Sequence, residues 1–265
     1  MRCFPALALA AITIAVLPVQ VAAAESDALA TSTQLIVVTT ADWNAVDGRL
    51  QRYQRATPKQ AWRPVGAPIS IVVGKTGLAW GTGVTPTDAP TIHAASDPVK
   101  KEGDGKAPAG VFALGTAFGY ATQPMHDSKM PYLNLTPSVE CVDDPNSKHY
   151  NRVLDRSTVT PPDWNSSEHM LRSDNLYRWG IVVGHNGIVA EGNANPPAPG
   201  GGSCIFLHIW RAPGQGTVGC TAMPQRDLES LLTWLDPKRK PLLVQLPVTD
   251  YERLRDHWRL PPLTK

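Results

Sequence analysis

Short apolar runs bounded by turn residues recur along the whole chain. Each run has four to six residues, and most are rich in Val, Ile and Leu and lie next to Gly, Pro, Asn or Asp. This pattern is typical of a protein built from many short β-strands. The predicted strands cover residues 35–40, 69–74, 78–81, 111–114, 179–183, 205–210 and 242–246. The second and third are expected to form a hairpin around the turn Lys75-Thr76-Gly77.

Two segments show helical spacing instead. Apolar residues stand three or four positions apart in 43–53, directly after the first strand, and again in 228–235 near the C-terminus. Pro224 suits the first turn of the second helix. Loops rich in turn residues are expected over 142–162 and 192–202. The fold class predicted from these patterns is mostly β with a few helices.

The first residues have the layout of a secretory signal peptide. Arg2 supplies a positive charge, residues 6–19 are nearly all apolar, and Ala22-Ala23-Ala24 forms a small-residue cleavage site. The apolar stretch is too short to span a bilayer comfortably, and no later run reaches the roughly 18 to 20 residues that a spanning helix needs. We therefore expect residues 1–24 to be removed. The mature chain, 25–265, is expected to be exported as one domain with no transmembrane segment.

The charge balance limits the class of partner. The formal net charge is +2, and no long run of Lys and Arg appears. Phosphate binding depends on clustered cationic side chains, so nucleic acid is not expected as the main partner.

A candidate nucleophile and a candidate base lie close together in the sequence. His208 ends an apolar run, and Cys220 follows a loop that contains Gly214, Gly216 and Gly219. A thiol becomes reactive when a base or cation favours its thiolate, and a strand followed by a tight loop can bring the two residues together. The backbone N–H groups of Gly219 and Cys220 are candidates for stabilising an oxyanion. The alternative is a His that caps a strand and a Cys that fills the core.

Another histidine competes for the role of base. His185 also follows an apolar strand, but Asn186-Gly187 comes next and favours a hairpin turn there, so we prefer His208. The other histidines have no metal-ligand spacing with one another or with the cysteines, and no metal site is expected. A helix starting just after Cys220 is expected to lower the pKa of its thiol.

The residues around Cys220 resemble the catalytic domain of the L,D-transpeptidases, the YkuD-type family. The signature of that family is a His on a strand, a loop, and then Ser/Thr-His-Gly-Cys, which matches His208 and Thr217-Val218-Gly219-Cys220. Val218 replaces the second His of the signature, and Thr221-Ala222-Met223 replaces the polar or basic residues that commonly follow the cysteine. Because the upstream His is the general base in the family, these changes affect substrate contacts more than the nucleophile.

A second segment resembles the same family. Residues 103–112 match the family's Gly-Asp-x-x-Thr-Pro-x-Gly-x-Phe entry to a strand, with Ala107 where Thr is usual. Asp104 and Lys106 in this segment have the alternative interpretation of a solvated turn pair. The resemblance covers roughly 69–246 and implies a YkuD-like β-sandwich or barrel, preceded here by a strand and helix.

Export and the family resemblance together set the expected cysteine pairing. Signal cleavage leaves Cys141, Cys204 and Cys220, an odd number for an oxidising compartment. If Cys220 is the nucleophile, a Cys141–Cys204 disulfide accounts for the others. Residues 204, 206 and 208 would share one face of a strand, so this bridge would brace the strand that carries the base. The alternative is that Cys204 is a buried free thiol.

The resemblance implies an exported, periplasmic cysteine L,D-transpeptidase that acts on peptidoglycan stem peptides without cofactor or metal. Cys220 would form a thioester with a donor stem, and an amine acceptor, on a second stem or elsewhere, would resolve it. Substrate contacts are expected at Trp210, Arg211, Thr217 and Val218. Two alternatives remain open: a cysteine amidase or carboxypeptidase in which water resolves the thioester, and a catalytically silent protein that binds the cell wall.

Overall fold

The structure of the protein is a computed structural model that describes residues 28–86, 92–187 and 196–264. The predicted signal peptide, 1–24, lies outside the described residues. Within the described ranges, no helix is both long enough and apolar enough to cross a membrane.

The described chain is mostly β, as the sequence predicts, with three α-helices. The strands are β1 Gln34–Thr40, β2 Asp47–Gln54, β3 Arg63–Val72, β4 Leu78–Trp80, β5 Ala107–Gly119, β6 Tyr132–Asn134, β7 Val139–Val142, β8 Val153–Asp155, β9 Ser167–His169, β10 Trp179–Val183, β11 Phe206–Ile209, β12 Thr221–Met223 and β13 Leu242–Pro247. The helices are α1 Ala28–Thr31, α2 Gln225–Trp234 and α3 Val248–Leu254, and short 3-10 turns cover Arg156–Thr158 and Pro237–Arg239.

The main sheet closes on itself. Its strands run in the order β10-β11-β12-β3-β2-β1-β13-β5-β4, and β10 also pairs with β5. At its centre β1 and β13 pair in parallel, and nearly every residue of both strands is buried. Strands covered on both faces are expected to have such continuous apolar runs. The predicted barrel-like fold is therefore confirmed.

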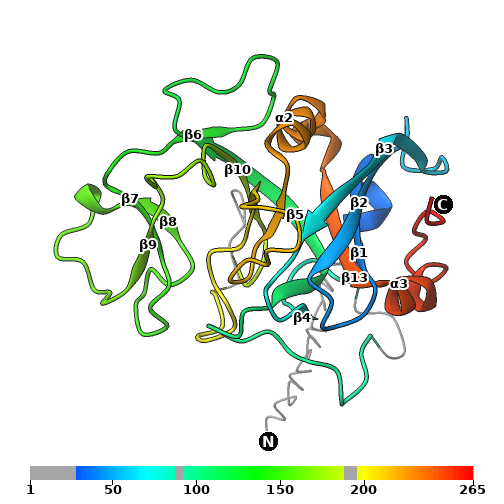
Figure 1. The fold of residues 1–265 in the computed structure, drawn as a ribbon, viewed down its shortest axis with the longest axis horizontal. Helices are drawn as coiled ribbons and strands as arrows, with labels where there is room; N and C mark the ends of the chain where they lie inside the picture. The colour runs from blue at the N-terminus through cyan, green and yellow to red at the C-terminus, as the bar shows by residue number, and fades with distance from the viewer. Residues whose placement is uncertain (1–27, 87–91, 188–195, 265) are drawn as a thin grey trace, which may run out of the picture.

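A second, smaller sheet lies to one side of the main sheet (Figure 1). It has the order β8-β7-β9, and the segment that follows β9 leads back into β10 of the main sheet. The helix α2 lies against β10 and β11 and buries Leu228, Leu231 and Leu232, as its apolar spacing predicts. The strand β11, which carries His208, is thus a member of the main sheet and is covered by α2.

The helix expected over 43–53 is wrong. These residues enter β2, which pairs antiparallel with β1 on one edge and β3 on the other. Leu50 and Tyr53 are buried by this pairing, and the side chain of Asp42 accepts the N–H groups of Asn44 and Ala45 in the preceding turn. The four apolar residues at helical spacing do not by themselves distinguish a helix from a strand, and pairing on both edges of β2 decides the outcome.

Two smaller predictions also need correction. The 69–81 hairpin reduces to one bridge between Gly74 and Gly77, because β4 pairs in parallel with β5 instead of with β3. The stretch 142–162 is not entirely loop, since it contains β8. The other expected loop, 192–202, is described only from residue 196, and that part has no helix or strand.

Candidate active site

The structure brings His208 and Cys220 onto neighbouring strands. His208 lies on β11, Cys220 comes immediately before β12, and these two strands pair in parallel with His208 opposite Ala222. The Cys220 thiol is 3% exposed and lies in a core cluster with Phe206 and Tyr177. The N–H of Phe206 donates to the sulfur at 3.3 Å. The pairing of β11 with β12 thus brings the strand of His208 beside the strand that follows Cys220, and the catalytic roles of the two residues stay predictions.

The ring of His208 is held in one orientation. Its Nδ1 lies 2.8 Å from the carbonyl oxygen of Ile209. Because a carbonyl only accepts, Nδ1 carries the proton and Nε2 has the free lone pair. The edge of the ring packs on Tyr177, with ring centroids 5.2 Å apart. Burial lowers the pKa of His208 to about 4, so the ring is neutral and able to accept a proton at pH 7.

The Cys220 thiol is protonated at neutral pH. Burial, and then the nearby charge of Glu168, raise its pKa to about 12, against smaller opposing effects of the Phe206 N–H, Lys100 and Tyr177. The thiol donates to the carbonyl of Cys204 at 3.5 Å. The lowering of the pKa expected from the start of α2 is therefore wrong, because desolvation exceeds a helix-end effect. The resting pair is a neutral thiol and a neutral imidazole.

Thr217 fixes the loop that carries the nucleophile. Its backbone N–H donates to Val73 at 2.9 Å, and its carbonyl accepts from Lys75 at 2.7 Å, so the loop is attached to the end of β3. Its hydroxyl donates to the carbonyl of Cys220 at 2.6 Å and accepts the N–H of Gly219 at 3.1 Å. The Gly219 N–H is thus engaged in this state. Its expected role toward an oxyanion stays a prediction and requires this bond to be given up.

The other expected contact residues differ in exposure. Trp210 is half-buried, and its backbone N–H donates to the carbonyl of Met223, whereas Arg211 is exposed. Val218, in the place of the family's second His, is 74% exposed. The Val218 side chain can make apolar contact with a ligand but cannot form a hydrogen bond. The substrate roles of Trp210, Arg211, Thr217 and Val218 stay predictions.

The predicted disulfide is confirmed. Cys141 on β7 is bonded to Cys204, with Cα atoms 6.0 Å apart, and Cys220 is the free cysteine of the described residues. The argument from a shared strand face is wrong in detail, since β11 begins at Phe206 and Cys204 has a left-handed φ of 56°. The bridge instead joins the small sheet to the residue whose carbonyl accepts from the thiol.

His185 has a structural environment. Its Nε2 donates to the carbonyl of Gly201 at 3.0 Å, and its buried Nδ1 has no hydrogen-bond partner among the described residues. Asn186 and Gly187 both have positive φ, 48° and 81°, so the expected turn exists. It is not a hairpin turn, because β10 pairs with β11 only after a much longer connection.

The segment 103–112 is more ordered than a solvated turn pair. The Asp104 carboxylate accepts from Lys100 Nζ at 2.7 Å and from the N–H of Lys106 at 2.9 Å. The side chain of Lys100 is only 4% exposed. This organised loop feeds β5, as the family-like motif predicts.

Three residues near the thiol were missed by the sequence analysis: Lys100, Glu168 and Tyr177. All three come from segments far from Cys220 in the chain, and none belongs to a motif with recognisable spacing. Tyr177 stands two residues before a predicted strand, which is the only signal that pointed to it.

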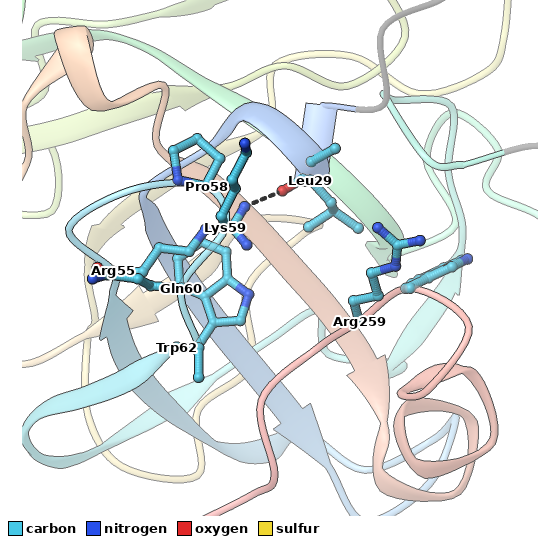
Figure 2. A pocket seen from close by; sticks show the side chains of 10 residues that line it. Leu29, Arg55, Pro58, Lys59, Gln60, Trp62 and Arg259 are labelled. Carbon is cyan, nitrogen blue, oxygen red and sulfur yellow. Dashed lines mark hydrogen bonds between the residues drawn. The ribbon is translucent and has the colours of Figure 1, made fainter.

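A separate pocket of about 610 Å³ is shown in Figure 2. It is lined by Leu29 of α1, Arg55, Trp62 and their neighbours. The Arg55 guanidinium donates to the carbonyls of Leu29 and Ser32 and stacks on Trp62 at 4.1 Å. Arg55 therefore anchors α1, and neither His208 nor Cys220 lines this pocket.

Comparison with known proteins supports the same assignment. The model of a family described as the L,D-transpeptidase catalytic domain, YkuD, matches residues 40–248. Searches among curated proteins and among solved structures found no match. The family match covers well over half of the chain and includes β2 to β13, His208 and Cys220. The chain therefore belongs to the YkuD L,D-transpeptidase catalytic-domain family.

Proposed function

We propose that this protein is a cysteine acyltransferase that exchanges amide bonds in peptidoglycan stem peptides, with Cys220 as nucleophile and His208 as general base. The observation that carries the proposal is a buried free thiol immediately before β12, the strand that pairs with the one carrying a histidine whose Nδ1 is fixed by a backbone carbonyl. That arrangement leaves Nε2 as the proton acceptor, which is what general-base activation of a thiol requires.

The proposed first half-reaction forms a thioester. The Cys220 sulfur attacks the carbonyl carbon at the third residue of a donor stem, and the thiol proton passes to Nε2 of His208. The C–N bond to the terminal D-alanine then breaks, and the histidine returns the proton to the leaving amine. Because the sulfur is 3% exposed, the donor must displace surrounding groups as it binds.

The second half-reaction transfers the acyl group. An acceptor amine gives its proton to Nε2 and attacks the thioester carbonyl, and the sulfur leaves and regains a proton. The energy of the donor amide is conserved in the product, so no nucleotide is consumed. This economy suits the periplasm, the location that we propose for the mature protein.

Water in place of the amine would make the same site a cysteine amidase or carboxypeptidase. The exposed Val218 favours this second candidate, because its side chain supplies no hydrogen bond that would hold an acceptor amine. The chemistry of Cys220 and His208 is the same in both cases.

The test is mass analysis of the protein incubated with a disaccharide tetrapeptide, with and without an added amine acceptor. A cross-linked or amine-capped product with release of D-alanine supports transfer. A tripeptide alone in both incubations supports hydrolysis. No product in either, or equal products from Cys220→Ala, would contradict the proposal and favour a silent wall-binding protein.

A further inference from the structure

Glu168 is placed beside the nucleophile by strand pairing and the disulfide. On β9 it lies directly opposite Cys141 of β7, and Cys141 is bonded to Cys204. The carbonyl of Cys204 accepts from the Cys220 thiol. The small sheet thus brings a carboxylate to the thiol from a segment more than fifty residues earlier in the chain.

Tyr177 connects this carboxylate to the candidate dyad. Its hydroxyl donates to Oε1 of Glu168 at 2.7 Å, and its ring packs on His208 and on Phe206. Tyr177 and Cys220 also belong to one buried cluster, in which the Tyr177 hydroxyl lowers the pKa of the thiol. One hydroxyl proton therefore has two competing acceptors, the Glu168 carboxylate and the sulfur anion.

Glu168 is the poorly compensated charge at the thiol. Arg172 comes no closer to it than 3.8 Å, and its guanidinium is already bound bidentately to Asp174 at 3.0 and 2.9 Å. The other cation that affects the thiol, Lys100, is paired with Asp104 at 2.7 Å. Burial raises the pKa of Glu168, yet its side chain is 24% exposed, so a ligand can reach it.

We propose that Glu168 and Tyr177 form a charge-sensing subsite beside Cys220, at which an alkylammonium group of the acyl donor compensates the carboxylate and favours loss of the thiol proton. While the carboxylate is uncompensated, it holds the Tyr177 hydroxyl and repels a sulfur anion. Once an ammonium pairs with it, the hydroxyl can donate to the sulfur, and transfer of the thiol proton to Nε2 of His208 during the attack becomes easier. Glu168 contacts the donor, Tyr177 is a positioning residue, and the subsite deepens the proposed function on which it rests.

The first test measures the rate at which iodoacetamide alkylates Cys220 at pH 8, followed on the peptide that contains it. A like charge or a hydrogen bond shifts a neighbouring pKa by about one unit or more, which changes the thiolate fraction about tenfold. Loss of nucleophilicity with falling pKa leaves a net change of about threefold. Glu168→Gln should therefore speed alkylation about threefold, and Tyr177→Phe should slow it about threefold.

The opposite effects expected of the two variants on the alkylation rate distinguish the proposed subsite from a mere loss of packing. A merely loosened site would speed alkylation in both variants, and that outcome, or no change in either, would overturn the proposal. Glu252→Gln removes an exposed carboxylate on α3, which packs on β13 and β1, and should leave the rate unchanged. Near-ultraviolet circular dichroism checks that each variant is folded.

The second test begins with the unaltered protein and uses Glu168→Gln as its control. n-Butylammonium should accelerate alkylation of Cys220 in the unaltered protein, whereas n-butanol should not, and Glu168→Gln should abolish the acceleration. Equal effects of the ammonium and the alcohol would overturn the subsite. Neither test involves turnover of substrate. A negative result here would therefore overturn the subsite without bearing on the disaccharide tetrapeptide experiment that tests the proposed function.

Discussion

At the scale of single residues, the site holds two uncharged groups. The thiol of Cys220 and the imidazole of His208 are both kept neutral at pH 7 by desolvation. A neutral pair must transfer its proton during the attack, so His208 acts as a general base and not as the cation of a preformed ion pair. The same burial protects the resting thiol, because only the thiolate reacts readily.

This protonation state predicts an unusual pH dependence. With a His208 pKa of about 4, acylation of Cys220 by a carbapenem should proceed at nearly the same rate at pH 5 and pH 7, and should fall only as the pH approaches 4. A histidine with the ordinary pKa of about 6.5 would make the rate at pH 5 about 25-fold lower than at pH 7. Single-turnover mass measurement at both pH values decides between the two. A loss of about 25-fold, with circular dichroism showing an intact fold, would contradict the neutral pair.

The dyad could be predicted from the sequence, but its surroundings could not. His208, Gly219 and Cys220 stand in a short local motif, which survives the loss of the family's second His. Glu168 and Tyr177 reach the thiol only through the pairing of β9 with β7 and through the disulfide. The spacing of residues along the sequence does not predict that Glu168 and Tyr177 lie near the Cys220 thiol.

At the scale of elements, the loop 211–219 positions the nucleophile through its contact with the end of β3. Gly216 is part of this contact, since a Cβ there would lie 2.5 Å from Cα of Lys75. Gly216→Ala should therefore push the loop outward and slow acylation of Cys220 at least about tenfold, because small displacements of a reacting group cost large factors in rate. Overpacking should lower the free energy of unfolding by about 1 to 3 kcal/mol.

The matched control for this substitution is Gln215→Ala, at the exposed neighbouring position. It should leave both the acylation rate and the stability unchanged. A Gly216→Ala protein that is acylated at the original rate would show that the contact with β3 does not position Cys220.

The helices and strands whose sequences have a clear apolar run or stripe were predicted, whereas those without such a pattern were not. The strands β1, β10, β11 and β13 are continuous apolar runs, and α2 has a clear apolar stripe. The segment that forms β2 has only sparse apolar residues, so pairing with β1 and β3 overrides its spacing. The strands β7, β8 and β9 have three or four residues each and leave no periodic signal.

At the scale of the whole molecule, one disulfide joins the small sheet to the segment just before β11, the strand that carries the base. Cys141 and Cys204 are 63 residues apart in the chain. Closing a loop of that length reduces the entropy of the unfolded chain, which corresponds to about 4 kcal/mol of stability in the loop-entropy model. The bridge is expected to hold Glu168 and the Cys204 carbonyl in place at the site.

Removal of the bridge should therefore destabilise the fold. The double substitution Cys141→Ala and Cys204→Ala should lower the free energy of urea unfolding by about 2 to 4 kcal/mol relative to the oxidised protein. Treatment of the unaltered protein with reductant should have a similar effect, and should have none on the double variant. Equal stability of the oxidised and reduced proteins would show that the bridge does not constrain the chain.

The most direct test of the Cys220–His208 assignment is covalent capture of the acyl-enzyme. Incubation with a carbapenem, a strained acyl donor, should add the mass of one inhibitor to the peptide that contains Cys220. His208→Ala should slow this addition at least about a hundredfold, as expected for loss of a positioned general base. His185→Gln, which keeps a donor for the Gly201 carbonyl, should change it little. An adduct on another residue, or greater damage from His185→Gln than from His208→Ala, would contradict the assignment.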